Sequence, residues 1–285
     1  GADLAKGWTL SGDGLSYDFD LQTGVRFHDG STFDADDVVA TMDKILNPKE
    51  GVLSMRKIAF DSVDSVTKVD PLTVRFNLNR EDGILPKSIA IGFNVMVSKD
   101  TLEELDYDLR PAFDAPGTGP FKYMNHKQKE VWNLEKNADY FKDGLPYLDR
   151  LKIFHGTGAA AAAALLSGQV DYSAWLNKGD GDKIVAGDFP GFKSMTWGVY
   201  NNTAIWFNSN RKPFDDERVR RAIFLAVDPH VMLALWNSTR LGDFGEWVPP
   251  QSLGGTYSRS LEELAETPGW RTPTAEDVQE AKDLM

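Results

Sequence analysis

The chain has 285 residues, 41% of them hydrophobic, which is enough for more than one compact unit. Its 43 acidic residues outnumber its 31 basic ones, and the net charge of -12 argues against nucleic acid as a partner. The longest apolar run, 159–166, is far shorter than the roughly 20 residues of a membrane-spanning helix, so we expect no direct membrane insertion of this chain. The absence of cysteine excludes disulfides and thiol chemistry.

The first 115 residues carry the pattern of an antiparallel sheet with helices beside it. Apolar and polar residues alternate from Leu15 to Leu21, and a turn leads back to a partner strand at 8–10. Asp34 is placed to cap a helix that ends at Asn47, and a second hairpin is predicted over 63–78. Thr101 and Glu104 have capping-box spacing and predict a short helix. This segment therefore predicts an α+β unit.

The pattern changes after Pro116–Phe121, where prolines and glycines alternate. One more hairpin is predicted over 121–134. A strand at 151–154, a helix at 159–166 and a strand at 170–174 then predict a βαβ unit with a parallel sheet. Because 116–121 has no phosphate-binding lysine, we interpret it as a crossing between domains. Beyond it the sequence predicts a strand at 205–207 and helices that begin near Asp216, Pro229 and Thr274.

The strongest enzyme-like motif is Gly156-Thr157-Gly158, which begins a G-x-G-x-x-A pattern between a strand and a helix. This context suits a pyrophosphate, so a nucleotide-dependent enzyme is one hypothesis. However, the following predicted strand does not end in the acidic residue that would bind the ribose of a dinucleotide. A plain strand-to-helix turn is therefore favoured over a nucleotide site. The carboxylates of Asp34, Asp36 and Asp37 suit a helix N-terminus better than calcium. We expect the four scattered histidines to lie in turns or at the surface, and we predict no catalytic residue, metal or cofactor.

Aromatic and amide side chains at two places suit a small-molecule cleft. Trp175 and Asn177 follow the predicted strand at 170–174, and ligands collect beyond the carboxyl ends of strands in open α/β sheets. Tyr200, Asn201 and Asn202 combine a flat apolar face with amide donors and acceptors. We predict these five residues as ligand contacts; an aromatic core with turn asparagines is the alternative.

Several segments, taken together in order, resemble the family 5 extracellular solute-binding proteins, the dipeptide- and oligopeptide-binding components of ABC importers. They cover most of the chain from residue 4 to about residue 236. They are Leu4-Ala5-Lys6-Gly7-Trp8, Gly24-Val25-Arg26-Phe27-His28-Asp29-Gly30, Gly117-Thr118-Gly119-Pro120-Phe121-Lys122, Asn137-Ala138-Asp139-Tyr140-Phe141, Leu166-Ser167-Gly168-Gln169-Val170-Asp171 and Val219-Arg220-Arg221-Ala222-Ile223.

The resemblance implies an α/β fold with an α+β accessory domain, as in a two-lobed periplasmic binding protein of the type II, peptide-binding-like class. On that mapping, 1–115 is the accessory domain, 116–204 the central part of lobe I with the βαβ unit, and 205–285 the helical start of lobe II. It also implies that a chain of this kind is truncated at both ends relative to family members.

The implied function is that of a monomeric periplasmic or lipid-anchored extracellular receptor, without chemistry. It would deliver a peptide or similar small solute to the membrane permease of an ABC transporter. A non-peptide ligand, such as an oligosaccharide, an opine, a metal chelate or haem, is the alternative within the same fold.

Overall fold

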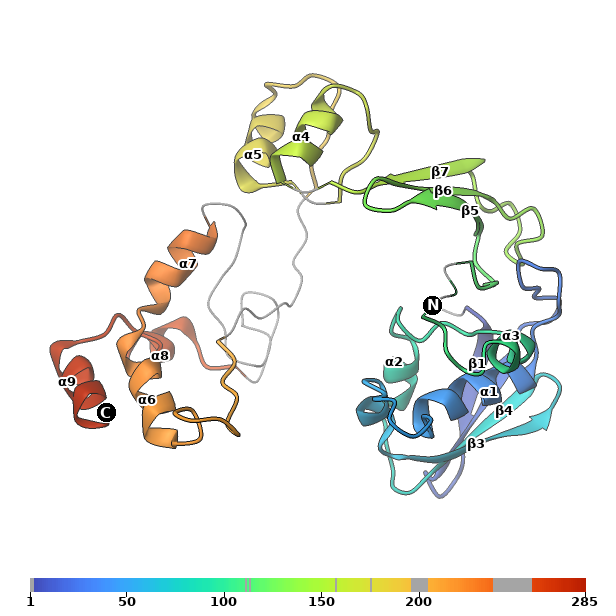
Figure 1. Ribbon diagram of the computed structural model, residues 1–285, viewed down its shortest axis with the longest axis horizontal. Coiled ribbons are helices and arrows are strands. Elements are labelled where there is room, and N and C mark those ends of the chain that lie inside the picture. The colour runs from blue at the N-terminus through green and yellow to red at the C-terminus, as the bar shows by residue number, and fades with distance from the viewer. Residues whose placement is uncertain are drawn as a thin grey trace. The chain divides into compact units, whose positions relative to one another are not determined.

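The computed structural model describes residues 3–110, 112, 114–156, 158–174, 176–195, 205–237 and 258–285. The chain forms two compact units, each held together by contacts among its own residues: a first unit of residues 1–155 and a second unit of residues 156–285 (Figure 1). The boundary that the sequence suggests at 115/116 does not coincide with this division, and the three-domain assignment stays a prediction.

The first unit is built on a four-stranded antiparallel sheet with the order β1-β2-β4-β3. The strands are β1 (Ala5–Leu10), β2 (Ser16–Leu21), β3 (Val63–Asp70) and β4 (Thr73–Leu78). Every second residue of β2 and β4 is buried, among them Tyr17, Phe19, Val74 and Phe76, because successive side chains point to opposite faces of a sheet. Both hairpins predicted in this region are confirmed.

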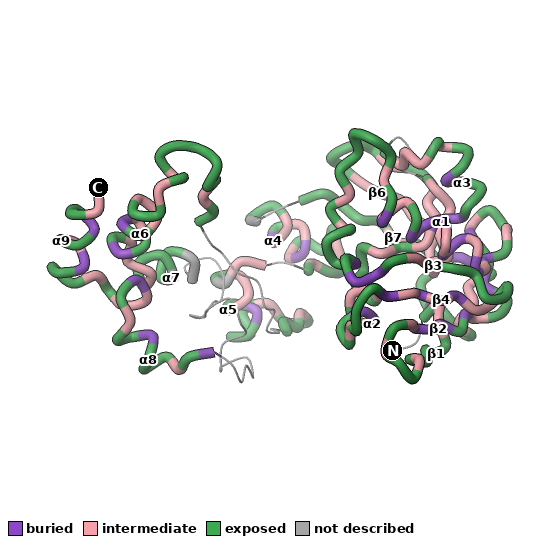
Figure 2. Tube along the Cα trace, turned by 90° about the horizontal axis from the view of Figure 1, so that it is seen from below, coloured by how far each residue is buried: buried purple, intermediate pink, exposed green. Residues whose placement is uncertain are grey.

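Helix α1 (Ala35–Leu46) covers this sheet, and the buried positions gather around α1 and β4 (Figure 2). It begins in a capping box: the Asp34 side chain accepts from Asp36 N, and Asp37 accepts from Asp34 N. Its apolar side chains at helical spacing, Val38 and Met42, join the core. The helix predicted from Asp34 to Asn47 is therefore confirmed.

Three short helices complete this half of the first unit. They are η1 (Lys57–Phe60), α2 (Leu85–Ile89) and α3 (Lys99–Glu104). Helix α3 begins earlier than its sequence pattern suggests, because the Ser98 hydroxyl, and not that of Thr101, accepts the capping hydrogen bond. The buried Leu102 of α3 packs with Ala40 in the middle of α1.

A second, three-stranded sheet consists of β5 (Phe121–Lys127), β6 (Val131–Lys136) and β7 (Arg150–Phe154). Its order is β5-β6-β7 and both pairings are antiparallel. The described residues 170–174 form no strand, and Tyr172 there is 72% exposed. The predicted βαβ unit is therefore wrong: β7 pairs antiparallel with β6, and no second strand follows helix 158–166 within the described residues 170–174.

The described part of the second unit is helical. Its helices are α4 (Gly158–Leu166), α5 (Lys178–Ala186), α6 (Glu217–Ala226), α7 (Pro229–Asn237), α8 (Leu261–Ala265) and α9 (Ala275–Asp283). Helices α6 and α9 pack through Ala222, Leu225 and Ala281. The expected strand at 205–207 is not formed. Among the described helices, none has the length and apolar character needed to cross a bilayer.

Candidate functional site

His28 joins the two sheets of the first unit. Its ring Nε2 lies 3.0 Å from Gly119 O, and Gly117 N donates to its Nδ1 at 3.3 Å. The backbone of His28 also donates to Gly117 O at 2.8 Å, and its carbonyl accepts from Lys122 Nζ at 3.2 Å. A residue that the sequence places in a turn therefore fixes the segment that leads into β5.

Asn137 completes this joint from the end of β6. Its side chain, buried with only 2% exposed, donates from Nδ2 to Gly119 O at 3.0 Å and accepts from Asp139 N. Its backbone N–H donates to Pro120 O. Because buried polar groups are costly unless they are paired, this set of bonds rigidifies 117–120. We interpreted residues 116–121 from sequence as a crossing between domains. In the structure this segment connects the two sheets of the first unit.

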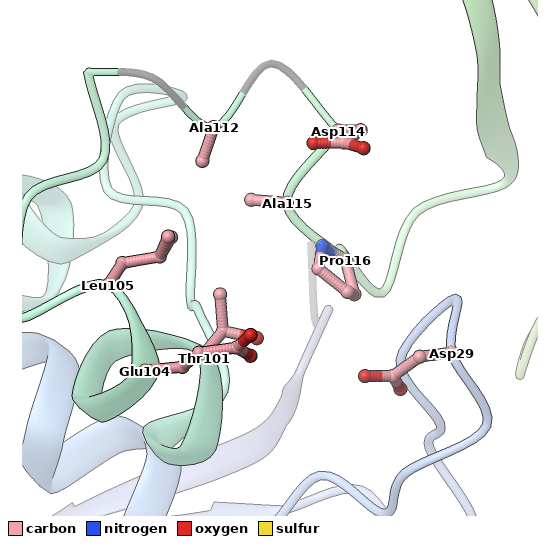
Figure 3. A pocket seen from close by; sticks show the side chains of 8 residues that line it. All are labelled: Asp29, Thr101, Glu104, Leu105, Ala112, Asp114, Ala115 and Pro116. Atoms are coloured by element: carbon pink, nitrogen blue, oxygen red, sulfur yellow. The ribbon is translucent and has the colours of Figure 1, made fainter.

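A shallow pocket of about 410 Å³ lies beside this joint. Figure 3 shows Thr101, Glu104 and Leu105 of the α3 region on one side, and Ala112, Asp114 and Asp29 across the opening. Ala115 and Pro116 complete the lining. The lining carries three carboxylates and no aromatic ring, which does not match the aromatic walls expected of a ligand cleft. Among the described residues, no group of three or more His, Asp or Glu side chains could hold a metal ion.

Exposed apolar side chains also lie on two other segments of the first unit, residues 52–58 and 84–95, which we call the apolar patch. The segments meet where η1 contacts α2, and the Arg56 guanidinium lies 4.4 Å from the centre of the Phe93 ring. Leu53 is 83% exposed and Phe93 75%. The other large exposed side chains of the patch are Val52, Met55, Ile58, Ile84, Ile91 and Val95.

Exposed apolar side chains gathered in this number are uncommon on a surface that faces only water, and they mark interaction sites. The patch was not predicted from sequence, because apolar residues in an irregular segment are usually expected to be buried. A signal was present in the composition: 51–60 and 83–98 are rich in Leu, Ile, Val, Met and Phe without helical or strand periodicity.

Asn177 is the one predicted ligand residue that the structure describes. It caps helix α5: its Oδ1 accepts from Asp180 N at 2.9 Å, and its Nδ2 donates to Asp180 Oδ2 at 2.5 Å. Trp175, Tyr200, Asn201 and Asn202 lie outside the described residues. The ligand role of these five residues stays a prediction.

The glycine motif at 156–158 lacks the surroundings that a dinucleotide site needs. Helix α4 begins at Gly158, and β7 precedes it, but β7 pairs antiparallel with β6. No parallel strand follows α4 within the described residues 158–174. The motif therefore stands outside the strand-helix-strand setting in which such glycines cradle a pyrophosphate.

Known proteins match most of this chain. The model of the bacterial extracellular solute-binding proteins, family 5 middle region, matches residues 1–285. Glutathione-binding protein GsiB of Salmonella paratyphi A is 29% identical over 239 residues, which are 81% of this chain and 44% of that protein. Heme-binding protein A of Haemophilus influenzae is 30% identical over 253 residues, 81% of this chain and 45% of that protein.

A solved structure matches as well. The oligopeptide-binding protein AppA of Bacillus subtilis, in complex with a nonapeptide, superposes with a TM-score of 0.74 at 26% identity. The match covers 99% of this chain and 54% of that one. The present chain thus spans under half the length of each of these two curated relatives.

Proposed function

The chain belongs to the bacterial extracellular solute-binding proteins of family 5, and from this membership we propose that the protein is a receptor that binds a small solute outside the cytoplasm. Its fold is that of the type II peptide-binding proteins, with mixed α/β content, as the sequence predicts. The observation that carries the proposal is the family match over residues 1–285.

The proposed ligand is a peptide or a similar small solute, which the receptor delivers to the membrane permease of an ABC importer. Relatives named for glutathione and heme, and a structural neighbour that holds a nonapeptide, support a small organic ligand of this general kind. A non-peptide ligand on the same fold is the alternative. The proposed receptor is a monomer that works either in the periplasm or, held by a lipid anchor, at the cell exterior.

The proposed ligand contacts are those predicted from sequence: Trp175, Asn177, Tyr200, Asn201 and Asn202. The pocket beside α3 is lined by carboxylates and lacks the aromatic walls of a small-molecule cleft. No catalytic step is proposed.

The test is calorimetry on the full-length protein with a panel of di- to nonapeptides, glutathione, haem, a nickel–histidine chelate and oligosaccharides. Saturable binding of one class, weakened by Trp175→Ala, is the expected result. The same protein is titrated with NAD, NADP and ATP. Saturable nucleotide binding that Gly158→Val abolishes, with none of the panel bound, would replace the receptor by a nucleotide-dependent enzyme.

A further inference from the structure

The ring of His28 can hold the joint between the two sheets of the first unit in one protonation state only. Gly117 N donates to its Nδ1 at 3.3 Å, so Nδ1 must carry a lone pair. The ring Nε2, which lies 3.0 Å from Gly119 O, must then carry the proton. A neutral imidazole with its proton on Nε2 satisfies both backbone groups, and no other state of the ring does.

Protonation of His28 removes the acceptor at Nδ1. Both ring nitrogens of an imidazolium are donors, so the Gly117 N–H is left without a partner and faces a second N–H. His28 and residues 115–120 are all half-buried, and a donor left unpaired away from water costs more than a hydrogen bond contributes. The bonds that remain are the backbone bond from His28 N to Gly117 O and those that Asn137 makes to the same segment. Protonation therefore opens the joint locally and leaves the two sheets intact.

Charged groups of several elements lie around the ring. Asp29 of the same turn interacts with it electrostatically, and Lys122 of β5 donates from Nζ to the His28 carbonyl at 3.2 Å. Glu104 of α3 and Asp114 line the pocket beside the joint (Figure 3). The carboxylates attract an imidazolium and the lysine repels it, so these charges oppose one another. The loss of the acceptor at Nδ1 acts in one direction only and decides the effect of protonation.

We propose that His28 is a pH switch in the first unit. When neutral, it fastens residues 117–119 to the turn at 28–30; when protonated, it releases them. Histidine is the side chain that ordinarily changes charge between about pH 5 and pH 8, whereas carboxylates and lysines keep their charge over this range. Because the released segment leads into β5, the switch controls how firmly the sheet β5-β6-β7 is attached to the sheet that α1 covers.

A protein outside the cytoplasm meets the pH of its surroundings directly. In that setting the switch would loosen the first unit in acid and tighten it near neutrality. This use of the switch rests on the proposed function. The switch itself is a property of the first unit, so it is measured without any ligand.

The experiment measures hydrogen exchange of the full-length protein at about pH 8 and about pH 5, the limits of the range in which histidine ordinarily titrates. Each rate is divided by the rate of an unstructured peptide at the same pH, because exchange itself depends on pH. The protection of the amides at 117–119 should fall by about 5- to 30-fold at the lower pH, which corresponds to the loss of one hydrogen bond. The hairpin of β3 and β4 contains no histidine and should keep its protection.

Two variants assign the effect to His28. His28→Gln keeps a side-chain donor and acceptor but carries no titrating group, so protection at 117–119 should no longer depend on pH. His155→Gln removes an exposed histidine of the same unit and should keep the wild-type response. Nitrogen NMR of isotope-labelled histidine in the wild type needs neither variant to fold. At about pH 8 the His28 Nδ1 should carry no proton and Nε2 should carry one.

Four results would overturn the inference. They are unchanged protection at 117–119 between the two pH values, a pH response that persists in His28→Gln, a protonated His28 Nδ1 at the higher pH, and an equal loss of protection in β3 and β4. The last would mean that the whole unit, and not the joint, responds to acid. Absence of ligand binding in the calorimetry described above would overturn the receptor function and leave the switch standing.

Discussion

His28 and Gly117 exchange two hydrogen bonds although 89 positions separate them in the sequence. The His28 N–H donates to Gly117 O at 2.8 Å, and the Gly117 N–H donates to His28 Nδ1 at 3.3 Å. Because Nδ1 accepts, the ring proton of neutral His28 lies on Nε2, and Nε2 is then the donor to Gly119 O. One imidazole thus satisfies two backbone groups of the segment that enters β5.

Replacing His28 by Phe keeps a ring of similar size and removes both side-chain hydrogen bonds. Each is worth about 1 kcal/mol, so the free energy of unfolding of the first unit should fall by about 2 kcal/mol. Urea unfolding measures the loss, and faster hydrogen exchange at 117–121 localises it. His155→Phe is the control, since His155 is exposed and should change stability by less than about 0.5 kcal/mol. Equal losses in the two variants would contradict the role of His28.

Asp36 and Asp37 are neighbours in the first turn of α1 but should respond very differently to substitution. Asp37 is buried and accepts from two backbone groups, Asp34 N at 2.9 Å and Lys99 N at 2.8 Å. Asp36 makes an exposed ion pair with Lys68.

Asp37→Asn leaves one of those two N–H groups without an acceptor and should destabilise the protein by about 1–3 kcal/mol in thermal unfolding at neutral pH. Asp36→Asn should cost less than about 0.5 kcal/mol, because solvent screens its pair. A larger loss for Asp36→Asn than for Asp37→Asn would show that the surface pair, and not the capping box, holds the turn.

The stability of the second unit should depend on pH through Asp277. The hydrogen bond from Arg271 is the largest cause that lowers the pKa of this carboxyl, and hydrogen bonds from Thr274 add to it, so that the pKa falls from 3.8 to about 2. Because the folded pKa lies below the unfolded one, ionised Asp277 stabilises the fold above about pH 4. That contribution is lost as the pH falls toward 2.

The measurement is the unfolding midpoint of the wild type and of Asp277→Asn as a function of pH. The gap between them should be widest above about pH 4 and should close as the pH approaches the folded pKa. Arg271→Gln removes the main cause of the shift, so the pH dependence of the gap should shrink in that background. A gap that is constant over this range would contradict the assignment.

Asn177 offers a way to separate capping from ligand binding. Asn177→Ser keeps a side-chain oxygen that can accept from Asp180 N, so α5 should retain its cap and thermal stability should change by less than about 0.5 kcal/mol. Asn177→Ala removes the acceptor and should cost about 1 kcal/mol. If the amide contacts the ligand, both variants should weaken binding in calorimetry. If the serine variant binds ligand like the wild type, Asn177 is only a helix cap.

Local signals in the sequence predict much of the fold. The alternation from Leu15 to Leu21 predicts β2 because burial on one face of a sheet requires it, and Asp34 predicts the start of α1 because a cap bonds to residues only two or three positions away. Asp216 and Thr274 begin α6 and α9 for the same reason.

Relationships between distant residues could not be predicted in this way. The strand expected at 170–174 required β7 as its parallel partner. No local sequence pattern indicates whether β7 pairs with residues 170–174 or with β6. His28 gives no sign in sequence that it bonds to Gly117. The exposure of Leu53 and Phe93 depends on how other segments pack around them. The apolar character of these residues does not predict that packing.

The position of β7 has a consequence for association between copies of the protein. Within the described residues, β7 is an edge strand that pairs only with β6. Its other edge presents backbone N–H and C=O groups with which a strand of a second molecule can pair. Arg150 and Lys152 are both exposed on this strand. Two identical edges brought together would place these positive charges near one another, which disfavours the pairing of β7 with the same strand of a second copy.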